Sequence, residues 1–517
     1  MTFLFFTGII NNQKVILLLK TLRNFITPSL SIDKNSSSQK WVLTGLILLA
    51  LFLRCFHISS ASLWFDEILT AGRTSQPVSS IIRDLLCLPH PPLYYLIVKS
   101  FTTFLGINEF ALRLPSMICS VLCVVTTFKL GKTLFDARTG LIAAFLVTVS
   151  AYSINYAHEA KMYSMTWLFA GLSYLYFFRW VTSQKSKDLI FYAVFTELLL
   201  GTSYQGFIFL AAQNCFFLFN RRSKRSDIWF MLQIVMISVW VPWLALVSLK
   251  FKSIEPNISW IQHWPYLDYF KFLFLNILDL KPWTGMDPVP LAQFPILKKI
   301  QMAAYVVLFS SSLIRMDNEN NRKRFTLDLG PSNLLLLSWI IIPVGFYIWV
   351  DKVCHPVLHV FCIRYLAFIQ IPIFLLIARS ISRLRFIALY SSIGLIMIAS
   401  VFFDLYPYYY DNLKVGGDDW RSVGQFLNKE VRKGSKVVFL YCPYPLFHNF
   451  HDGFALYYQG SRNIVGEYRL NDRSAKKGFY YLITYHQRTS SAEFWKHCEL
   501  IKIYDFRRIY ILKYRFS

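Results

Sequence analysis

Charge is scarce in this chain. Charged residues make up only 16% of its 517 residues, 55% are hydrophobic, and the mean hydropathy is +0.41. Soluble domains carry about 25% charged and 45–50% apolar residues, so a string of soluble domains could not cover this much apolar surface. Intrinsic disorder is excluded for the same reason. The nine cysteines include no Cys-x-x-Cys pair and are too few for a disulfide scaffold. These scarcities indicate a polytopic membrane protein.

Several motifs of soluble enzymes and pumps are also missing. The chain has no Asp-x-Asp, the usual metal and diphosphate site of soluble nucleotide-sugar transferases, no Walker A loop and no Gly-x-Ser-x-Gly turn. These absences weigh against ATP-driven transport and serine hydrolysis. The net charge of +25 would suggest nucleic acid in a soluble protein. In a membrane protein, basic cytoplasmic loops account for it, so no nucleic-acid partner is predicted.

Apolar runs of nearly 20 residues recur along the chain. They predict eleven membrane-spanning helices, at about 41–57, 109–130, 140–157, 162–181, 188–204, 206–220, 228–249, 298–315, 333–350, 365–379 and 386–403. Pro91–Leu105 is shorter, opens with two prolines and contains Lys99, which favours a helix lying in the membrane plane. With a cytoplasmic N-terminus, every inner loop on this count is basic, as the positive-inside rule requires.

This topology divides the chain into three parts. Residues 1–40 form a cytosolic or interfacial segment. Residues 41–403 form the transmembrane domain, with long outer segments at 58–108 and 250–297, and residues 404–517 form an extracytoplasmic domain. The predicted fold class is an α-helical polytopic membrane protein in the cell membrane, with a small α/β domain at its C-terminus.

The extracytoplasmic domain carries both helical and strand patterns. Asp419–Arg432 has helical spacing and Gly434 follows it, which predicts a helix. Runs rich in β-branched and aromatic residues predict strands at Lys436–Tyr441, Phe454–Tyr458, Phe479–Thr484 and Ile501–Leu512.

Ionisable side chains gather in the segments that this topology places outside. Asp66 and Glu67 follow Trp64 just beyond the first span. Two adjacent carboxylates at a membrane boundary are costly unless they have a function; the structural alternatives are a solvated acid pair or a helix N-cap by Asp66. His90 opens the Pro-rich entry to the in-plane helix, where it could be a donor, a metal ligand or a plain loop residue.

Further along, charged residues recur at the same face. Arg113 begins the second span and Arg364 the tenth; each could snorkel to the interface or bind a phosphate there. Glu159 and Lys161 lie in the turn after the third span and could form a structural ion pair or part of a composite site. His355 and His359 are four residues apart, but Pro356 interrupts them and no carboxylate is near, so a metal pair is not favoured.

In this order, the motifs resemble the polyprenyl-phosphate-sugar-dependent glycosyltransferases of the GT-C superfamily. The similarity is greatest to the bacterial branch of glycosyltransferase family 39, which is related to protein O-mannosyltransferases and lipid A aminoarabinose transferases. The matching motifs are Trp64–Glu67, His90–Leu93, Arg113–Ser116, Glu159–Ser164 and Arg364–Tyr365. Two positions depart from the pattern. Lys161 stands where relatives usually have arginine, and Thr202–Gln205 lacks the histidine that many relatives carry there.

The resemblance implies a lipid-linked sugar donor, transfer on the outer face, and polyprenyl phosphate as the leaving group. Asp66 is then expected to be the base that deprotonates the acceptor, with Glu67 and Glu159 orienting the acceptor or holding a divalent metal. Cations must stabilise the departing phosphate. The candidates are Arg113, Lys161 and Arg364, supported by His90, Tyr163 and Tyr365. No cofactor is certain. The acceptor could be a lipid, a glycan or a protein.

Two other functions remain open at this stage. The many spans would suit a transporter or flippase of lipid-linked sugars, although transporter sites lie at mid-membrane rather than in outer loops. A non-catalytic membrane scaffold with a binding domain outside is the second alternative. Loss of activity on replacing Asp66, in a chain that still folds, would separate an enzyme from both.

Overall fold

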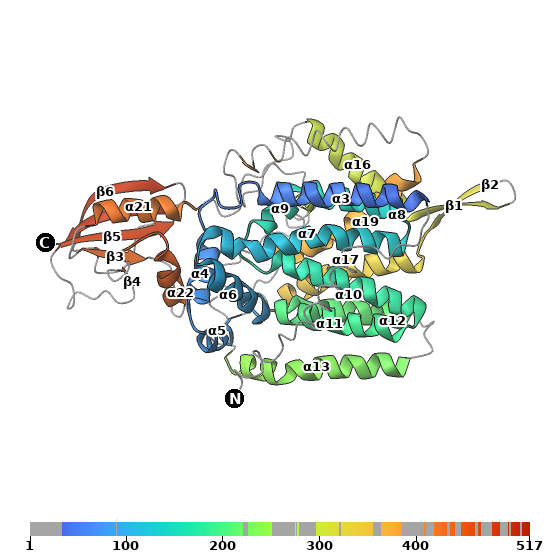
Figure 1. The fold of residues 1–517 in the computed structure, drawn as a ribbon, viewed down its shortest axis with the longest axis horizontal. Helices are drawn as coiled ribbons and strands as arrows, with labels where there is room; N and C mark the ends of the chain where they lie inside the picture. Colours follow the sequence, from blue (N-terminus) through green and yellow to red (C-terminus); the bar gives the residue numbers. More distant parts are fainter. Residues whose placement is uncertain are drawn as a thin grey trace.

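The computed structural model shows a bundle of helices with a sheet domain at one end (Figure 1). The residues that it describes are 34–88, 90–220, 226–250, 274–275, 277–278, 296–319, 322–354, 363–384, 405, 408–409, 418–431, 435–439, 446–460, 464–466, 478–485, 495, 498–506 and 509–516. Residues 1–33, the pair His355 and His359, and the expected span at 386–403 lie outside the described residues.

Ten of the eleven expected spans coincide with helices. They are α3 (Lys34–Cys55), α7 (Glu109–Leu134), α8 (Ala137–Val149) with α9 (Ala151–Ala157), α10 (Tyr163–Ser183), α11 (Ser186–Thr202), α12 (Gln205–Phe219), α13 (Ser226–Ser248), α16 (Ile296–Ser312), α17 (Pro331–Cys354), and α18 (Ile363–Leu366) with the short 3-10 helix η3 (Ala367–Ile369) and α19 (Gln370–Arg383).

The third expected span is bent. Helices α8 and α9 meet at 63°, and Ser150 lies at the break. The Ser150 side chain accepts a hydrogen bond from the Ser153 N–H and so caps the second helix. By length and composition, five described helices could cross a bilayer, at Ser37–Cys55, α7, α13, Pro331–Val353 and Arg364–Arg383, and this bent pair counts as a sixth. The multi-pass helical class is confirmed.

The two ends of the bundle differ in what they carry. Helices α4 (Phe65–Ser75), α5 (Val78–Leu85) and α6 (Leu93–Leu105) lie at the end beside the sheet domain (Figure 1). The opposite end carries the hairpin of β1 (Ile314–Glu319) and β2 (Arg322–Leu327). There Arg379 contacts Asp328 at 2.8 Å, and the Ser332 hydroxyl donates to the Leu134 carbonyl. Arg379 and the hairpin are among the segments that the sequence assigned to the inner face, so these segments share one end.

A buried arginine joins the first span to the bent one. Arg54 is fully buried and donates through Nη1 and Nη2 to the carbonyls of Thr148 (3.0 Å) and Val147 (2.9 Å). Its Nε donates to Ser120 Oγ at 2.8 Å, and Nη2 donates also to Ser153 Oγ at 3.1 Å. These carbonyls belong to the last turn of α8, where the C=O groups of a helix have no N–H donor within the helix itself. Sequence analysis did not single out Arg54.

The C-terminal sheet has the strand order β4-β3-β5-β7-β6. Its strands are β3 (Lys436–Phe439), β4 (Ile464–Gly466), β5 (Gly478–Tyr485), β6 (Cys498–Phe506) and β7 (Ile509–Phe516). The first three are parallel to one another, whereas β7 pairs antiparallel with β5 and β6. Helix α21 (Trp420–Glu430) packs on this sheet through the buried Trp420, and Asp419 caps it, close to the expected helix. The predicted α/β character is confirmed.

Two strand predictions in this domain were wrong. Residues 454–458 are not a strand, because helix α22 (Leu446–Phe454) runs into them and turns follow. Phe450, Phe454 and Tyr458 are four residues apart, and this spacing buries all three rings on one side. Ile501–Leu512 is not one strand but parts of β6 and β7, which form a hairpin.

Candidate active site

The two adjacent acids at the start of α4 face different surroundings. Trp64 is the N-cap residue, and its N–H donates to Glu67 Oε2 at 3.3 Å, which is the glutamate half of a capping box. Glu67 is fully buried, whereas the Asp66 side chain remains 29% exposed. Asp66 is therefore not the N-cap residue of this helix, which excludes the capping role that the sequence left open for it. Successive helical residues are about 100° apart, so one acid faces the core and the other an accessible space.

Glu67 and Arg113 form a buried ion pair. Arg113 Nε and Nη2 each lie 2.8 Å from a different carboxylate oxygen of Glu67, and both side chains are fully buried. Arg113 also donates to the carbonyls of Ile58 (2.7 Å), Ala61 (2.9 Å) and Ser62 (3.0 Å). A guanidinium has five N–H donors, and these five contacts use all of them. This geometry favours a role in holding the outer loop over one in binding a phosphate.

Glu67 has a further partner in another motif. Its Oε1 accepts a hydrogen bond from the Ala160 N–H at 2.9 Å. Ala160 lies between Glu159 and Lys161, in the turn that leads into α10. The buried carboxylate thus joins the segment that carries Asp66 to the turn of Glu159 and Lys161, about 90 residues further along the chain.

Asp66 meets a cation from the far part of the chain. Arg364 Nη1 lies 3.4 Å from Asp66 Oδ2, and the Arg364 guanidinium stacks over the Trp64 ring at 4.7 Å. The Arg364 side chain is only 9% exposed. The motifs Trp64–Glu67 and Arg364–Tyr365, almost 300 residues apart, therefore meet at one place.

A cavity of about 400 Å³ lies next to this pair. Its wall includes three predicted site residues, His90, Tyr163 and Tyr365. Tyr365 directly follows Arg364, which links the cavity to Asp66. The other side chains of the wall come mostly from α10, α12 and α17, and they are Met162, Thr166, Ser203, Tyr204, Gln205, Phe207, Ile208, Ala211, Ile342, Phe346 and Tyr347. The cavity wall thus combines polar side chains with apolar ones.

Gln205 occupies the stretch in which many relatives carry a histidine. Its Nε2 donates to the Tyr365 carbonyl at 2.8 Å and to the Tyr347 hydroxyl at 3.2 Å. The rings of Tyr347 and Tyr365 stack with centroids 6.1 Å apart. Gln205 therefore fixes two aromatic residues of the cavity wall, which is a structural role that the sequence did not indicate.

Lys161 and His90 are near enough to interact electrostatically. Lys161 is only 5% exposed, and its ammonium has no ion pair or hydrogen bond within the described part of the chain. Burial together with the positive charges of Lys161 and Arg73 holds the pKa of His90 well below its usual range. His90 is therefore neutral at pH 7 and able to donate or accept a hydrogen bond, while Lys161 remains available to an anion.

Glu159 is buried with Asn155, whose Nδ2 donates to Glu159 Oε1 at 3.0 Å. The sequence left open a structural ion pair between Glu159 and Lys161, and the structure does not form one. Among the described residues, no group of three or more His, Cys, Asp or Glu side chains could hold a metal ion. The expected metal role of Glu67 and Glu159 has no further ligand in that part of the chain.

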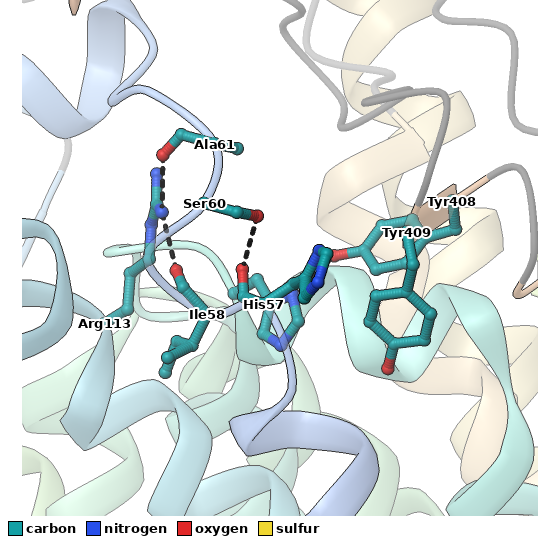
Figure 2. A pocket seen from close by; sticks show the side chains of 8 residues that line it. His57, Ile58, Ser60, Ala61, Arg113, Tyr408 and Tyr409 are labelled. Atoms are coloured by element: carbon teal, nitrogen blue, oxygen red, sulfur yellow. Dashed lines mark hydrogen bonds between the residues drawn. The ribbon is translucent and has the colours of Figure 1, made fainter.

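A second, smaller cavity lies behind Arg113. Figure 2 shows the Arg113 guanidinium directed at the carbonyls of Ile58 and Ala61, with the rings of Tyr408 and Tyr409 on the other side. Its volume is about 20 Å³, which is room for one water molecule. This space cannot hold a sugar, so the substrate site is better sought at the larger cavity.

Comparison with known proteins agrees with the expected resemblance. Residues 89–245 match the family described as dolichyl-phosphate-mannose-protein mannosyltransferase. No curated protein matches the chain in sequence.

Solved structures match over most of the chain. ArnT from Cupriavidus metallidurans in the apo state superposes with a TM-score of 0.56 at 11% identity, over 93% of this chain and 98% of ArnT. ArnT bound to undecaprenyl phosphate gives a TM-score of 0.51 at 10% identity, over 91% and 97%. The apo oligosaccharyltransferase of Archaeoglobus fulgidus gives 0.49 at 11% identity, over 86% and 69%. The resemblance to the GT-C superfamily is thereby confirmed, and the chain has the fold of a GT-C-type glycosyltransferase.

Proposed function

We propose that this chain is a membrane glycosyltransferase that moves a sugar from a polyprenyl-phosphate donor to an acceptor on the outer face. The observation that carries the proposal is the pairing of a partly exposed acid, Asp66, with Arg364, whose neighbour Tyr365 lines the cavity of about 400 Å³. The match of residues 89–245 to a mannosyltransferase family and the ArnT structure with undecaprenyl phosphate support the donor class. The donor sugar and the acceptor stay open.

Asp66 is the proposed base. An acceptor hydroxyl or amine attacks the anomeric carbon of the sugar, and its proton passes to the Asp66 carboxylate. The bond between the anomeric carbon and the phosphate oxygen breaks, and its electron pair leaves with polyprenyl phosphate. Inversion at the anomeric carbon is expected from the family resemblance.

Arg364 and Lys161 are the proposed phosphate partners. Both are nearly buried cations, and the low dielectric around them strengthens their attraction for a leaving phosphate. His90 and Tyr163 supply neutral hydrogen-bonding groups in the cavity wall. The apolar side chains of the cavity wall suit the isoprenoid units nearest the phosphate. Arg113 is assigned to positioning, because its five donors are already used.

The outer location follows from charge placement. The basic segments around Arg379 and the β1–β2 hairpin lie at the end opposite α4 and the sheet domain (Figure 1). Under the positive-inside rule that end is cytoplasmic. Asp66, the cavity and the C-terminal domain then face outward, and the N-terminus is cytoplasmic.

The test is transfer by the purified chain in liposomes. Radiolabelled polyprenyl-phosphate sugars are supplied one at a time with a membrane extract as acceptor, and both label transfer and movement of the donor across the bilayer are measured. Transfer by the wild-type chain and none by Asp66→Ala, with equal folding, supports the enzyme. Donor translocation without transfer would instead support a flippase, and neither activity would support a scaffold.

Replacing Lys161 tests the phosphate contact. Lys161→Met is expected to raise the KM for the donor about 10–100-fold, because a hydrogen bond to a charged group contributes about 1.5–3 kcal/mol. Lys161→Arg keeps the charge that relatives carry here and is expected to retain most of the affinity. Steady-state kinetics with varied donor measure both variants. An unchanged KM for the methionine variant would remove Lys161 from the phosphate site.

A further inference from the structure

The loop before Asp66 is anchored to the C-terminal domain by an arginine. Arg421, at the start of α21, donates to the carbonyls of Ser60 (3.0 Å) and Ser59 (3.1 Å) and to Glu109 Oε1 (2.7 Å). Glu109 begins α7, the second span. One guanidinium therefore joins the sheet domain, the outer loop and the membrane bundle.

Two more side chains hold the residues that enter α4. Tyr457 Oη accepts from the Leu63 N–H at 2.9 Å and donates to Glu109 Oε1 at 2.8 Å. Asp418 Oδ2 accepts from the Phe65 N–H at 3.3 Å, directly before Asp66. The first N–H groups of a helix have no acceptor within the helix. At the start of α4, the C-terminal domain supplies acceptors for the N–H groups of Leu63 and Phe65.

The other end of α4 crosses helix α22 at a pair of glycines. A Cβ on Gly453 would lie 2.0 Å from the Ile68 carbonyl oxygen, and a Cβ on Gly72 would lie 1.7 Å from that of Asn449. Both obstacles are backbone, which cannot rotate away. The two helices can approach this closely only because neither residue has a side chain.

Polar contacts flank this crossing. Asn449 Nδ2 donates to Asp84 Oδ2 at 2.8 Å, and the same carboxylate oxygen accepts from Arg73 Nε at 2.6 Å. Gln76, just past the end of α4, donates to Asp452 of α22. The C-terminal domain therefore holds α4 along its length as well as at its start.

We propose that the C-terminal domain is a positioning clamp for Asp66. Phe65 on one side and Gly72 on the other are fixed to it, and the short helix between them carries the acid. Gly453, Gly72, Tyr457 and Arg421 are positioning residues, since they act on the substrate only through the placement of Asp66. This inference rests on the proposed function, and it makes the domain a part of the catalytic unit.

Gly453→Ala tests the clamp in the full-length chain in liposomes. An ordinary contact lies above 3.4 Å, so the added Cβ forces the helices apart by more than 1 Å. A shift of that size can lower a rate about 100-fold. We expect kcat to fall by about this factor at an unchanged KM for the donor, and amide exchange in residues 64–70 to accelerate. The matched control is Gly345→Ala in α17, where a Cβ meets nothing within 4 Å.

A second variant tests the clamp with a smaller change that introduces no clash with the backbone. Tyr457→Phe removes only the hydroxyl between Leu63 and Glu109, and it is expected to lower kcat severalfold with the same unchanged KM and faster exchange. If exchange in residues 64–70 stays at the wild-type rate in both variants, or if it rises while kcat does not fall, the clamp is overturned. Absence of transfer by the wild-type chain would instead overturn the proposed function, and the exchange data would still report whether the domain holds α4.

Discussion

Replacing Asp66 with asparagine is expected to lower kcat for sugar transfer by about 10²–10⁴-fold, the usual contribution of a general base. The amide keeps the size of the side chain but cannot take the acceptor proton. Stability is expected to change little, because Asp66 is partly exposed and its contact with Arg364 is a single one at 3.4 Å. The asparagine amide oxygen can still accept a hydrogen bond from Arg364, so the nearly buried guanidinium keeps a partner. Single-turnover transfer and thermal unfolding measure the two effects.

The matched control for this experiment is Asp227→Asn. Asp227 is an exposed acid in the first turn of α13. It is expected to leave kcat unchanged, because the predicted topology puts the start of α13 on the inner face, opposite the segments that carry Asp66. A folded Asp66→Asn chain that transfers at the wild-type rate would move the base to another residue, and Glu159 would be the next to replace.

Breaking the pair of Glu67 and Arg113 is expected to have the largest effect on stability. Arg113→Met leaves a fully buried carboxylate without its cation and removes three hydrogen bonds to the loop carbonyls. Removing one partner of a buried pair costs about 3–5 kcal/mol. The free energy of unfolding, measured by denaturant titration in detergent, is expected to fall by about that amount. Glu67→Gln is expected to fall less, because the amide can still accept from Arg113.

A double variant separates the buried charge from the loop contacts. Glu67→Met with Arg113→Met removes both charges, and it is expected to recover part of the stability that Arg113→Met loses. The remaining deficit measures the three carbonyl contacts of Arg113 together with the two N–H groups, of Trp64 and Ala160, that lose Glu67 as their acceptor. Normal stability of Arg113→Met combined with a raised KM for the donor would contradict this account and restore the phosphate role that the sequence suggested.

Hydrophobic run length was enough to predict most of the bundle. Ten expected spans coincide with helices. A helix that crosses a bilayer needs about 20 consecutive apolar residues, and such a run can be recognised within one segment of the sequence. Of the site residues that the sequence proposed, the structure brings His90, Tyr163 and Tyr365 into one cavity. The predicted topology placed the segments that carry these residues on one face of the membrane, and this is why they could be expected to lie together.

Partners of individual side chains could not be predicted in the same way. Asp66 and Glu67 are adjacent and chemically alike, and only packing decides that one faces Arg364 and the other Arg113. The strand expected at Phe454–Tyr458 failed because a short aromatic run reads equally as strand or helix, and burial against Trp420 and Phe439 selected the helix. The glycine crossing of α4 and α22 depends on residues more than 350 positions apart, which no local pattern reports.

Arg54 has a consequence for how the chain enters the membrane during synthesis. An arginine at the centre of a lone membrane helix costs about 2.5–3.5 kcal/mol to insert, and Arg54 lies instead in the last turn of α3. Two of its acceptors, the Val147 and Thr148 carbonyls, are made more than 90 residues later. At the end of α3, the side chain can meanwhile extend to the headgroup region. Arg54 therefore gains these two acceptors only after the bent third span has been synthesised.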